Sequence, residues 1–197
     1  MPVDLDAAER AIAQFLRALG YDPEAHPDLR GTPARVAQAY ADELLRGAGV
    51  DVAELVRMGS EPFPEDAAAA GGLVAVRDIE TATVCPHHLT PAVGRATVAY
   101  LPGARLLGVG TIARLVDACA RRLAMQESVG QQVVDALMHH AGARGAYCRL
   151  ELVHGCLSAR GACQTRASVA TVACAGELSG SAVTPHLSRL IDERADG

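Results

Sequence analysis

Two short clusters of cysteine and histidine carry side chains that are typical zinc ligands. The first is Cys85-Pro86-His87-His88, in which a cysteine and a histidine stand three positions apart. The second is His154-Gly155-Cys156, and Cys156 follows His88 by 68 positions. Each cluster alone also fits an ordinary role, as a buried cysteine beside loop histidines or as a structural histidine in a strand. Together they predict a metal site that only a folded sheet can assemble.

Cys85, His88 and Cys156 would supply three protein ligands to one Zn²⁺ ion. Three protein ligands leave a fourth tetrahedral position for water, which is the arrangement of catalytic zinc. Residues i and i+2 of a strand point to the same face, so His154 and Cys156 can enter one pocket. We therefore expect zinc at these three ligands, with His87 and His154 flanking it as proton-transfer groups.

Further polar residues offer ligand recognition. Gln126 and Glu127 stand at a helix junction, where the carboxylate could accept hydrogen bonds from the ring N–H and amine of a guanine edge. The alternative is a solvated helix end, which the residues alone favour. Arg160 could bind phosphate bidentately, or could be a surface arginine.

The hydrophobic pattern along the chain predicts an α+β domain. Apolar residues spaced three to four apart indicate helices, and runs rich in β-branched residues indicate strands. Thr32 is expected to cap the second helix, with Pro33 at its first position. Helices are expected at 4–19, 32–47, 112–125, from a capping box at 128–131 onward, and at 185–194, and strands at 73–84, 95–101, 146–156 and 165–175.

We expect residues 1–58 to form an N-terminal helical region and residues 59–72 to form a mobile linker, because the sequence GSEPFPEDAAAAGG is rich in Gly, Pro and Ala. Residues 73–197 then form the region that carries both Cys/His clusters. The three parts are expected to make one functional domain.

The composition excludes several classes of function. The chain has 197 residues and a formal net charge of −5, so it lacks the basic excess of a nucleic-acid-binding module. No uncharged apolar stretch reaches the ~18–20 residues of a membrane span, and the acidic N-terminus does not fit a signal peptide. We therefore expect a cytoplasmic protein without nucleic-acid or membrane partners, whose six cysteines are reduced thiols or metal ligands.

All 18 basic residues are arginine. The absence of lysine excludes Schiff-base catalysis and a Walker-type phosphate lysine. Any anion site must therefore use arginine, backbone amides or hydroxyl groups.

The Cys/His clusters and the polar residues described above resemble the motifs of the GTP cyclohydrolase I family. The family's Cys-Glu-His-His zinc motif stands here at 85–88, its Gln-Glu pair at 126–127 and its His-x-Cys at 154–156. Four further motifs occur in the family's order, at 32–37, 97–102, 114–116 and 160–161. The resemblance covers about residues 30 to 190 at the level of motifs.

The resemblance implies a tunnelling fold, with an antiparallel sheet, helices on one side of it and an N-terminal helical pair. In this family the subunits join their sheets into a toroid, commonly a decamer, with active sites between subunits. The implied reaction is zinc-dependent hydrolysis of the guanine ring of GTP at C8, release of formate, and rearrangement to 7,8-dihydroneopterin triphosphate. By the same resemblance, Gln126 and Glu127 would bind the base, and Arg35, Arg114 and Arg160 would face phosphate.

The sequence departs from the family pattern mainly where phosphate and ribose would bind. Gly110-Thr111 stands in place of Ser-Lys, and the segment 165–171 is altered. Within the zinc motif, Pro86 replaces Glu. We expect Thr111 to cap a helix over 112–125, whose free amides would attract an anion without a lysine. Phosphate binding should then be weaker or less selective for three phosphates.

Two alternatives remain open on the sequence. One is a divergent purine-nucleotide enzyme that has other phosphate and ribose requirements or stops at a formamidopyrimidine product. The other is a non-catalytic zinc-binding paralogue. The presence of His87 and His154 argues against the second, because a binding protein has no need of proton-transfer groups.

Overall fold

A computed structural model describes residues 3–64 and 72–179. They have an α+β architecture and divide into two compact units between Arg46 and Gly47. Each unit is described on its own below. Among the described residues, no helix has both the length and the apolar content needed to cross a bilayer.

The N-terminal unit contains the expected pair of helices. Helix α1 (Leu5–Ala18) begins after Asp4, whose carboxylate accepts a hydrogen bond from the Ala7 amide at 2.9 Å. After the short 3₁₀ helix η1 (Pro27–Leu29), α2 (Thr32–Gln38) continues directly as a π-helical segment, η2 (Ala39–Leu44). The expected helix cap is wrong, because Gly31 precedes the helix in a left-handed conformation (φ 71°) and the Thr32 hydroxyl instead accepts from Arg35 at 2.9 Å.

The second unit is built on a four-stranded antiparallel sheet in the order β2-β3-β5-β6. Its strands are β2 (Val74–Val84), β3 (Pro91–Leu101), β5 (Gly145–His154) and β6 (Val169–Gly176). The strand pairs predicted from β-branched content are therefore confirmed, but the strand expected over 146–156 ends at His154, and Cys156 lies in a short helix rather than on the strand face shared with His154. The 3₁₀ segment η3 (Arg46–Gly49) spans the division between the units.

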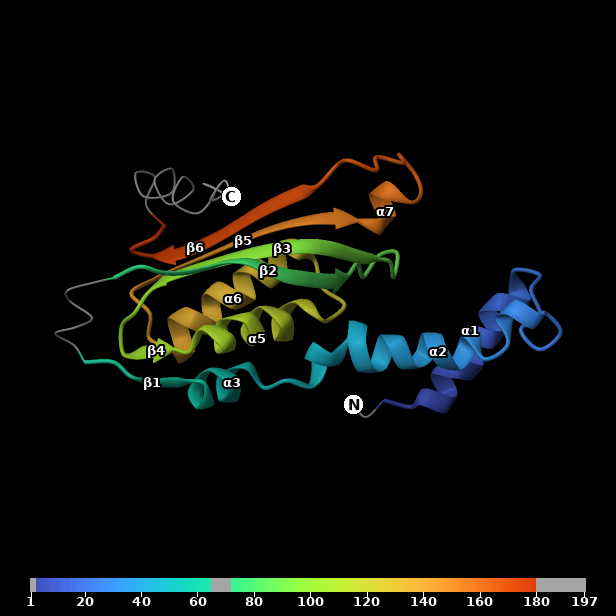
Figure 1. The fold of residues 1–197 in the computed structure, drawn as a ribbon, viewed down its shortest axis with the longest axis horizontal. Coiled ribbons are helices and arrows are strands. Elements are labelled where there is room, and N and C mark those ends of the chain that lie inside the picture. Colours follow the sequence, from blue (N-terminus) through green and yellow to red (C-terminus); the bar gives the residue numbers. More distant parts are fainter. Residues whose placement is uncertain (1–2, 65–71, 180–197) are drawn as a thin grey trace. The chain divides into compact units, whose positions relative to one another are not determined.

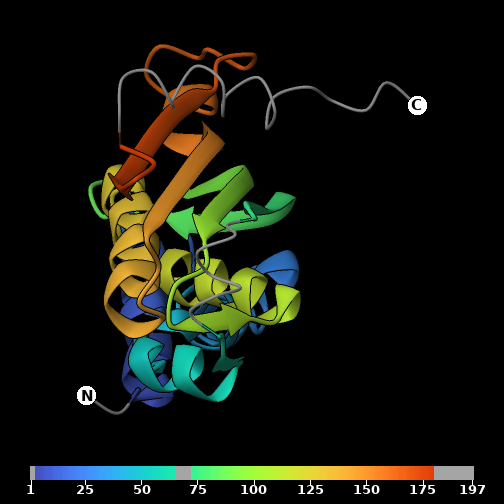
Figure 2. The ribbon, with the colours of Figure 1, turned by 90° about the vertical axis from the view of Figure 1, so that its left-hand side faces the viewer.

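Helices α5 (Val109–Ala120) and α6 (Gln126–His140) cover one face of this sheet, and α3 (Val52–Met58) packs against these two helices, as Figures 1 and 2 show from two directions. The apolar core lies between the helices and the sheet. Side chains such as Ile112 and Leu137 from the helices meet Val98 and Leu150 from the strands, and all four are fully buried. This layer gives the sheet a rigid backing on the side of the helices.

Several expected boundaries differ from the structure. Residues Ser60–Pro62, inside the expected linker, form strand β1 and pair with β4 (Arg105–Leu107). Helix α6 begins at Gln126, before the expected capping box. The rest of the expected linker at 65–71 and the expected helix at 185–194 lie outside the described residues.

Candidate metal centre and active site

The antiparallel sheet brings the two Cys/His clusters to one edge. Val84 at the end of β2 pairs with Pro91 at the start of β3, and Ala92 pairs with His154 at the end of β5. The β2–β3 loop, which carries the first cluster, therefore lies beside the short helix α7 (Gly155–Ser158), which carries Cys156. Strand pairing thus closes the gap of 68 positions between His88 and Cys156.

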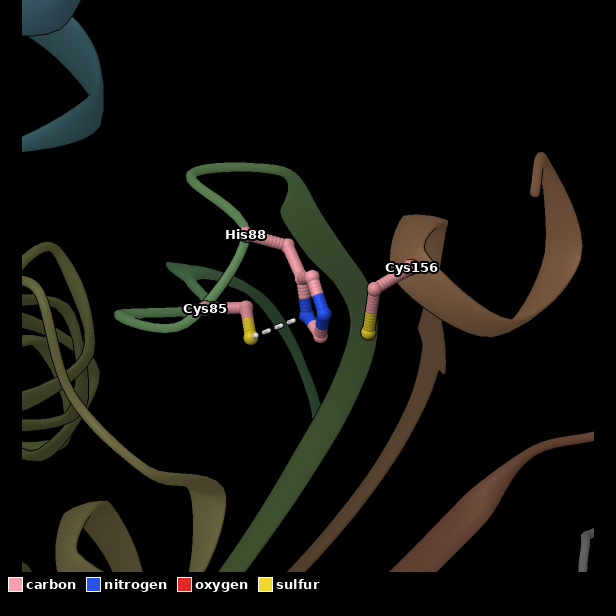
Figure 3. Close-up of side chains that lie close together, drawn as sticks. All are labelled: Cys85, His88 and Cys156. Atoms are coloured by element: carbon pink, nitrogen blue, oxygen red, sulfur yellow. Dashed lines mark hydrogen bonds between the residues drawn. The ribbon is translucent and has the colours of Figure 1, made fainter. Parts of the chain in front are cut away.

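The β2–β3 loop is held by its own backbone hydrogen bonds. The Cys85 amide donates to the Thr90 carbonyl, and the Leu89 amide donates to the Cys85 carbonyl, both at 2.9 Å. Leu89 closes the turn in the left-handed region, with φ 52°. Such a tight turn directs Cys85 and His88, three positions apart, toward a common point (Figure 3).

Gly155 allows α7 to approach this loop closely. A Cβ atom at this position would lie 3.0 Å from the Pro91 carbonyl oxygen and 3.3 Å from the Thr90 Cβ. Both distances are shorter than most Cβ contacts in proteins, so a larger residue would require the β2–β3 loop to shift by a few tenths of an ångström. The glycine between His154 and Cys156 therefore favours the close approach of α7 to the loop, which its spacing alone did not reveal.

Cys85, His88 and Cys156 converge in the structure (Figure 3). Their candidate ligand atoms all lie within 4.8 Å of one another, and Cys85 Sγ is 3.7 Å from His88 Nδ1. Tetrahedral zinc with Zn–S bonds of about 2.3 Å and Zn–N bonds of about 2.0–2.1 Å requires ligand atoms about 3.5–3.8 Å apart. Two thiols and an imidazole in this arrangement fit Zn²⁺, and they leave one coordination position open.

The other described thiols differ from these ligands. Cys119 and Cys148 are fully buried in the apolar core. Burial raises the pKa of Cys119 to about 11 and that of Cys148 to about 12, so both stay protonated at neutral pH and are poor metal ligands. Cys163 is exposed and Cys174 is half-buried, and neither belongs to the cluster.

The two histidines expected to transfer protons lie next to the ligands in the chain. His87 is exposed on the β2–β3 loop, and its ring meets that of His88 edge to face, with 6.3 Å between centroids. His154 is half-buried at the end of β5, and its Nε2 lies 2.7 Å from Gln126 Oε1. Neither ring is part of the three-ligand cluster.

Gln126 does not present a free edge to a base. Its side chain is 2% exposed. The amide nitrogen donates within the protein to the Leu150 and Val169 carbonyls and to the Thr171 hydroxyl, and the amide oxygen faces His154. The described contacts thus engage its donors and its acceptor within the chain, and its predicted role toward the base stays a prediction.

Glu127 and Arg160 remain available to a ligand. Glu127 lies exposed in the first turn of α6, and Arg160 is exposed just after α7. Within residues 3–64 and 72–179, neither side chain makes a hydrogen bond or an ion pair. Their predicted roles toward base and phosphate stay predictions.

The structure changes the expectation for Thr111. Helix α5 starts at Val109 with Gly108 as its N-cap, so Thr111 lies inside the first turn and caps nothing. Its side chain is 2% exposed and packs so closely under Gly59 that a Cβ there would collide with it. Its hydroxyl accepts from Arg114 at 3.2 Å, so Thr111 is placed to orient that arginine rather than to meet an anion.

Arg35, the third expected phosphate ligand, lies exposed on α2 in the N-terminal unit. Its guanidinium donates to Thr32, one turn earlier. Its role toward phosphate stays a prediction.

Comparison with known proteins gives consistent matches along the chain. The sequence profile described as GTP cyclohydrolase I matches residues 8–190. "GTP cyclohydrolase 1" of Leifsonia xyli subsp. xyli (strain CTCB07) is 42% identical over 184 residues, which cover 93% of each chain. "GTP cyclohydrolase 1" of Allorhizobium ampelinum is 38% identical over 172 residues, covering 87% of this chain and 83% of the relative.

Among solved structures, the apo form of the archaeosine synthase QueF-Like aligns with 58% of this chain and 96% of its own. The TM-score is 0.41 and the sequence identity 17%. This similarity is too low to bear on function.

Proposed function

The chain belongs to the GTP cyclohydrolase I family, and we propose that it hydrolyses the imidazole ring of GTP at C8, releases formate and forms 7,8-dihydroneopterin triphosphate. The observation that carries this proposal is the convergence of Cys85, His88 and Cys156 at one edge of the sheet. Their geometry fits zinc and leaves an open coordination position for the reacting water.

Zn²⁺, when bound by these three residues, supplies the Lewis acidity that makes a water molecule nucleophilic near neutral pH. The two thiols and the imidazole hold the ion on backbone that is fixed by strand pairing and by the turn of the β2–β3 loop. The close approach at Gly155 keeps Cys156 against that loop.

His87 and His154 donate and accept the protons of the reaction. C8 is a poor electrophile in neutral guanine, and a proton delivered to N7 makes it more reactive. An imidazole can both donate and accept protons near neutral pH, so one ring protonates N7 while the other accepts the proton from the attacking water. In the later ring opening the C8 hydroxyl group gives its proton to the first ring and N9 takes a proton from the second, so both histidines regain their starting states while N7 keeps its proton.

Glu127 selects the base. Its carboxylate can accept from N1–H and the exocyclic amine of guanine, whereas adenine presents an acceptor at N1. The exposed position at the start of α6, free of intramolecular partners in the described chain, supports this role.

Arg114 and Arg160 bind the phosphates in this proposal, and the assignment of Arg35 to phosphate rests on the family resemblance alone. Arg114 is exposed, and the buried Thr111 hydroxyl orients it. At Gly110 no side chain reaches outward, and space is open where a Cβ would stand. This observation favours a second candidate, a guanine-nucleotide ring-opening enzyme with a relaxed phosphate or ribose requirement, and leaves a non-catalytic paralogue as the third.

We further propose that the chain acts in the cytoplasm as a homo-oligomer, a decameric toroid of tunnelling-fold subunits with sites between them. Strands β2 and β6 end the four-stranded sheet in the described chain, and a free edge can pair with another subunit. Mass photometry of the purified protein tests the assembly, and a monomer at micromolar concentration would contradict it.

Anaerobic incubation of the zinc-loaded protein with GTP, followed by mass spectrometry of the products, tests the function. Formation of 7,8-dihydroneopterin triphosphate with one formate per GTP supports the main proposal. Accumulation of a formamidopyrimidine nucleotide, or of its deformylated product, supports the second candidate. A protein that holds zinc and leaves GTP intact would be the non-catalytic paralogue.

A further inference from the structure

The side chain of Gln126 is the most densely bonded polar group near the candidate active site. It is 2% exposed and stands at the first position of α6. Its amide contacts two strands, β5 through Leu150 and His154, and β6 through Val169 and Thr171. A buried amide with so many partners has little freedom to rotate.

The partners decide which amide atom is the nitrogen. One atom lies 3.1 Å from the Leu150 carbonyl oxygen and 2.8 Å from the Val169 carbonyl oxygen. Backbone carbonyls only accept hydrogen bonds, so this atom must be the donating Nε2. The other atom, which faces His154 Nε2 at 2.7 Å, is therefore the acceptor Oε1.

The same hydrogen bonds determine which ring nitrogen of His154 carries the proton. An amide oxygen can only accept, so a hydrogen bond to it requires a proton on His154 Nε2. In the neutral ring, Nδ1 then carries the free lone pair. We propose that Gln126 is a positioning residue, which fixes the orientation of the His154 ring and its Nε2–H tautomer through the 2.7 Å hydrogen bond.

The arrangement also resists a flip of either group. Turning the amide would set its oxygen against two carbonyl oxygens, and turning the imidazole would break the 2.7 Å bond. Leu150 and His154 belong to the same strand, so the Gln126 amide is hydrogen-bonded to the backbone of the strand that carries the imidazole. The tautomer follows from the fold alone, whereas its catalytic importance rests on the proposed function.

The tautomer is measured by solid-state NMR of the zinc-loaded protein labelled with ¹⁵N-histidine. Loss of a signal in His154→Asn assigns the resonances among the seven histidines. The expected spectrum shows a protonated Nε2 and an unprotonated Nδ1 for His154. A proton on Nδ1 of the neutral ring would overturn the proposal, and this measurement needs no variant of Gln126.

The second experiment replaces Gln126 by methionine, which has similar length and no acceptor oxygen. The variant should retain its zinc, and a smaller fraction of His154 should carry the proton on Nε2. The value of kcat should fall about 10- to 100-fold, the range typical of residues that hold a group next to a metal site. KM for GTP should change less than kcat, since Gln126 does not face substrate. A loss of activity with an unchanged tautomer would reduce Gln126 to a structural role and overturn the proposal.

Gln131→Met is the matched control on the same helix. Gln131 is exposed, and its amide donates to Asp135 at 2.8 Å. The substitution should leave tautomer, zinc content and kcat unchanged. If the wild-type protein proves inactive toward GTP, the proposed function fails, while the NMR spectra still decide the positioning role of Gln126.

Discussion

The metal-binding edge of the sheet and the start of α5 belong to the same unit, and they are held in different ways. At the edge, Cys85 is buried and paired strands fix the backbone on both sides. At the start of α5, Gly108 makes no side-chain cap and Gly110 is exposed. Strand pairing therefore fixes the backbone of the first region, whereas the second presents few side chains to a ligand.

The region held by strand pairing is the one where the sequence keeps the family's ligand residues, and the start of α5 is where it departs from the family pattern. The motifs that carry the zinc ligands are present, whereas Gly110 and Thr111 replace the family's Ser-Lys. A lost metal ligand removes the whole site, but exposed charged contacts each contribute little. The phosphate region can therefore change with smaller consequences, and the predictions below run from the rigid region to the open one.

The largest effect is expected from Cys85→Ser or Cys156→Ser. Each variant removes one of three ligands, so zinc and activity should be lost together. Metal analysis of the purified variants and a turnover assay with GTP measure this. Cys163→Ser, at an exposed thiol outside the cluster, is the control and should keep both. Full zinc occupancy in either ligand variant would contradict the assignment.

His87→Ala and His154→Ala should keep zinc and reduce turnover about 10²–10⁴-fold, because each removes a proton-transfer group without removing a ligand. Metal content and kcat are measured on the same preparations. His139→Ala, near the C-terminal end of α6, serves as the control. An empty metal site in His87→Ala would mean that ligand and proton-transfer group are exchanged within the His87-His88 pair.

Glu127→Gln should weaken the binding of guanine nucleotides but not that of adenine nucleotides. Loss of a charge-assisted hydrogen bond costs about 1.5–3 kcal/mol, or roughly 10- to 150-fold in affinity. Binding of GTP and ATP to the variant and the parent measures the effect. Asp135→Asn makes the same charge change on the same helix and should leave GTP binding intact. An equal loss for both purines would assign Glu127 a structural role.

The smallest effect is expected at the phosphates. The parent should discriminate among GTP, GDP and GMP by only a few-fold, since each exposed arginine contact contributes about 0–1 kcal/mol. Gly110→Lys adds a cation where a Cβ has open space and should raise the preference for GTP. Thr111→Lys is the contrasting variant, and it should lower the melting temperature because Thr111 is buried under Gly59.

A strong preference of the parent for GTP would show that the phosphate site has been rebuilt from other groups. It would also remove the contrast between the two regions. Product analysis of Gly110→Lys then shows whether the added cation changes the yield of pterin relative to ring-opened intermediates.

Local spacing was sufficient for much of the fold. The β-branched runs predicted all four strands of the main sheet, and apolar periodicity predicted α5 and α6, which cover it, but not α3. The errors lie at helix starts and in the linker. Gly108 and Met125, rather than Thr111 and Ser128, precede α5 and α6, because neither start uses a side-chain cap that a sequence motif could reveal.

The candidate ligands were recognisable from residue type, since Cys85 and His88 stand close in the chain and a turn can orient both. The role of Gln126 was not recognisable. Its partners, at Leu150, Val169 and Thr171, lie 24 to 45 positions away, and only the pairing of β5 with β6 places them around one amide.

The residue types therefore determine the kinds of chemistry available to this protein. Two thiols and an imidazole can bind zinc, two further imidazoles can transfer protons, and no lysine is present to bind phosphate. Their geometry depends on the fold. Strand register sets Cys156 against the β2–β3 loop. Cys85, Cys119 and Cys148 are all buried, but Cys85 lies beside His88 and Cys156, whereas apolar side chains surround the other two thiols. Hydrogen bonding and desolvation act between atoms that are near in space, and nearness in space follows from the packing of the whole chain.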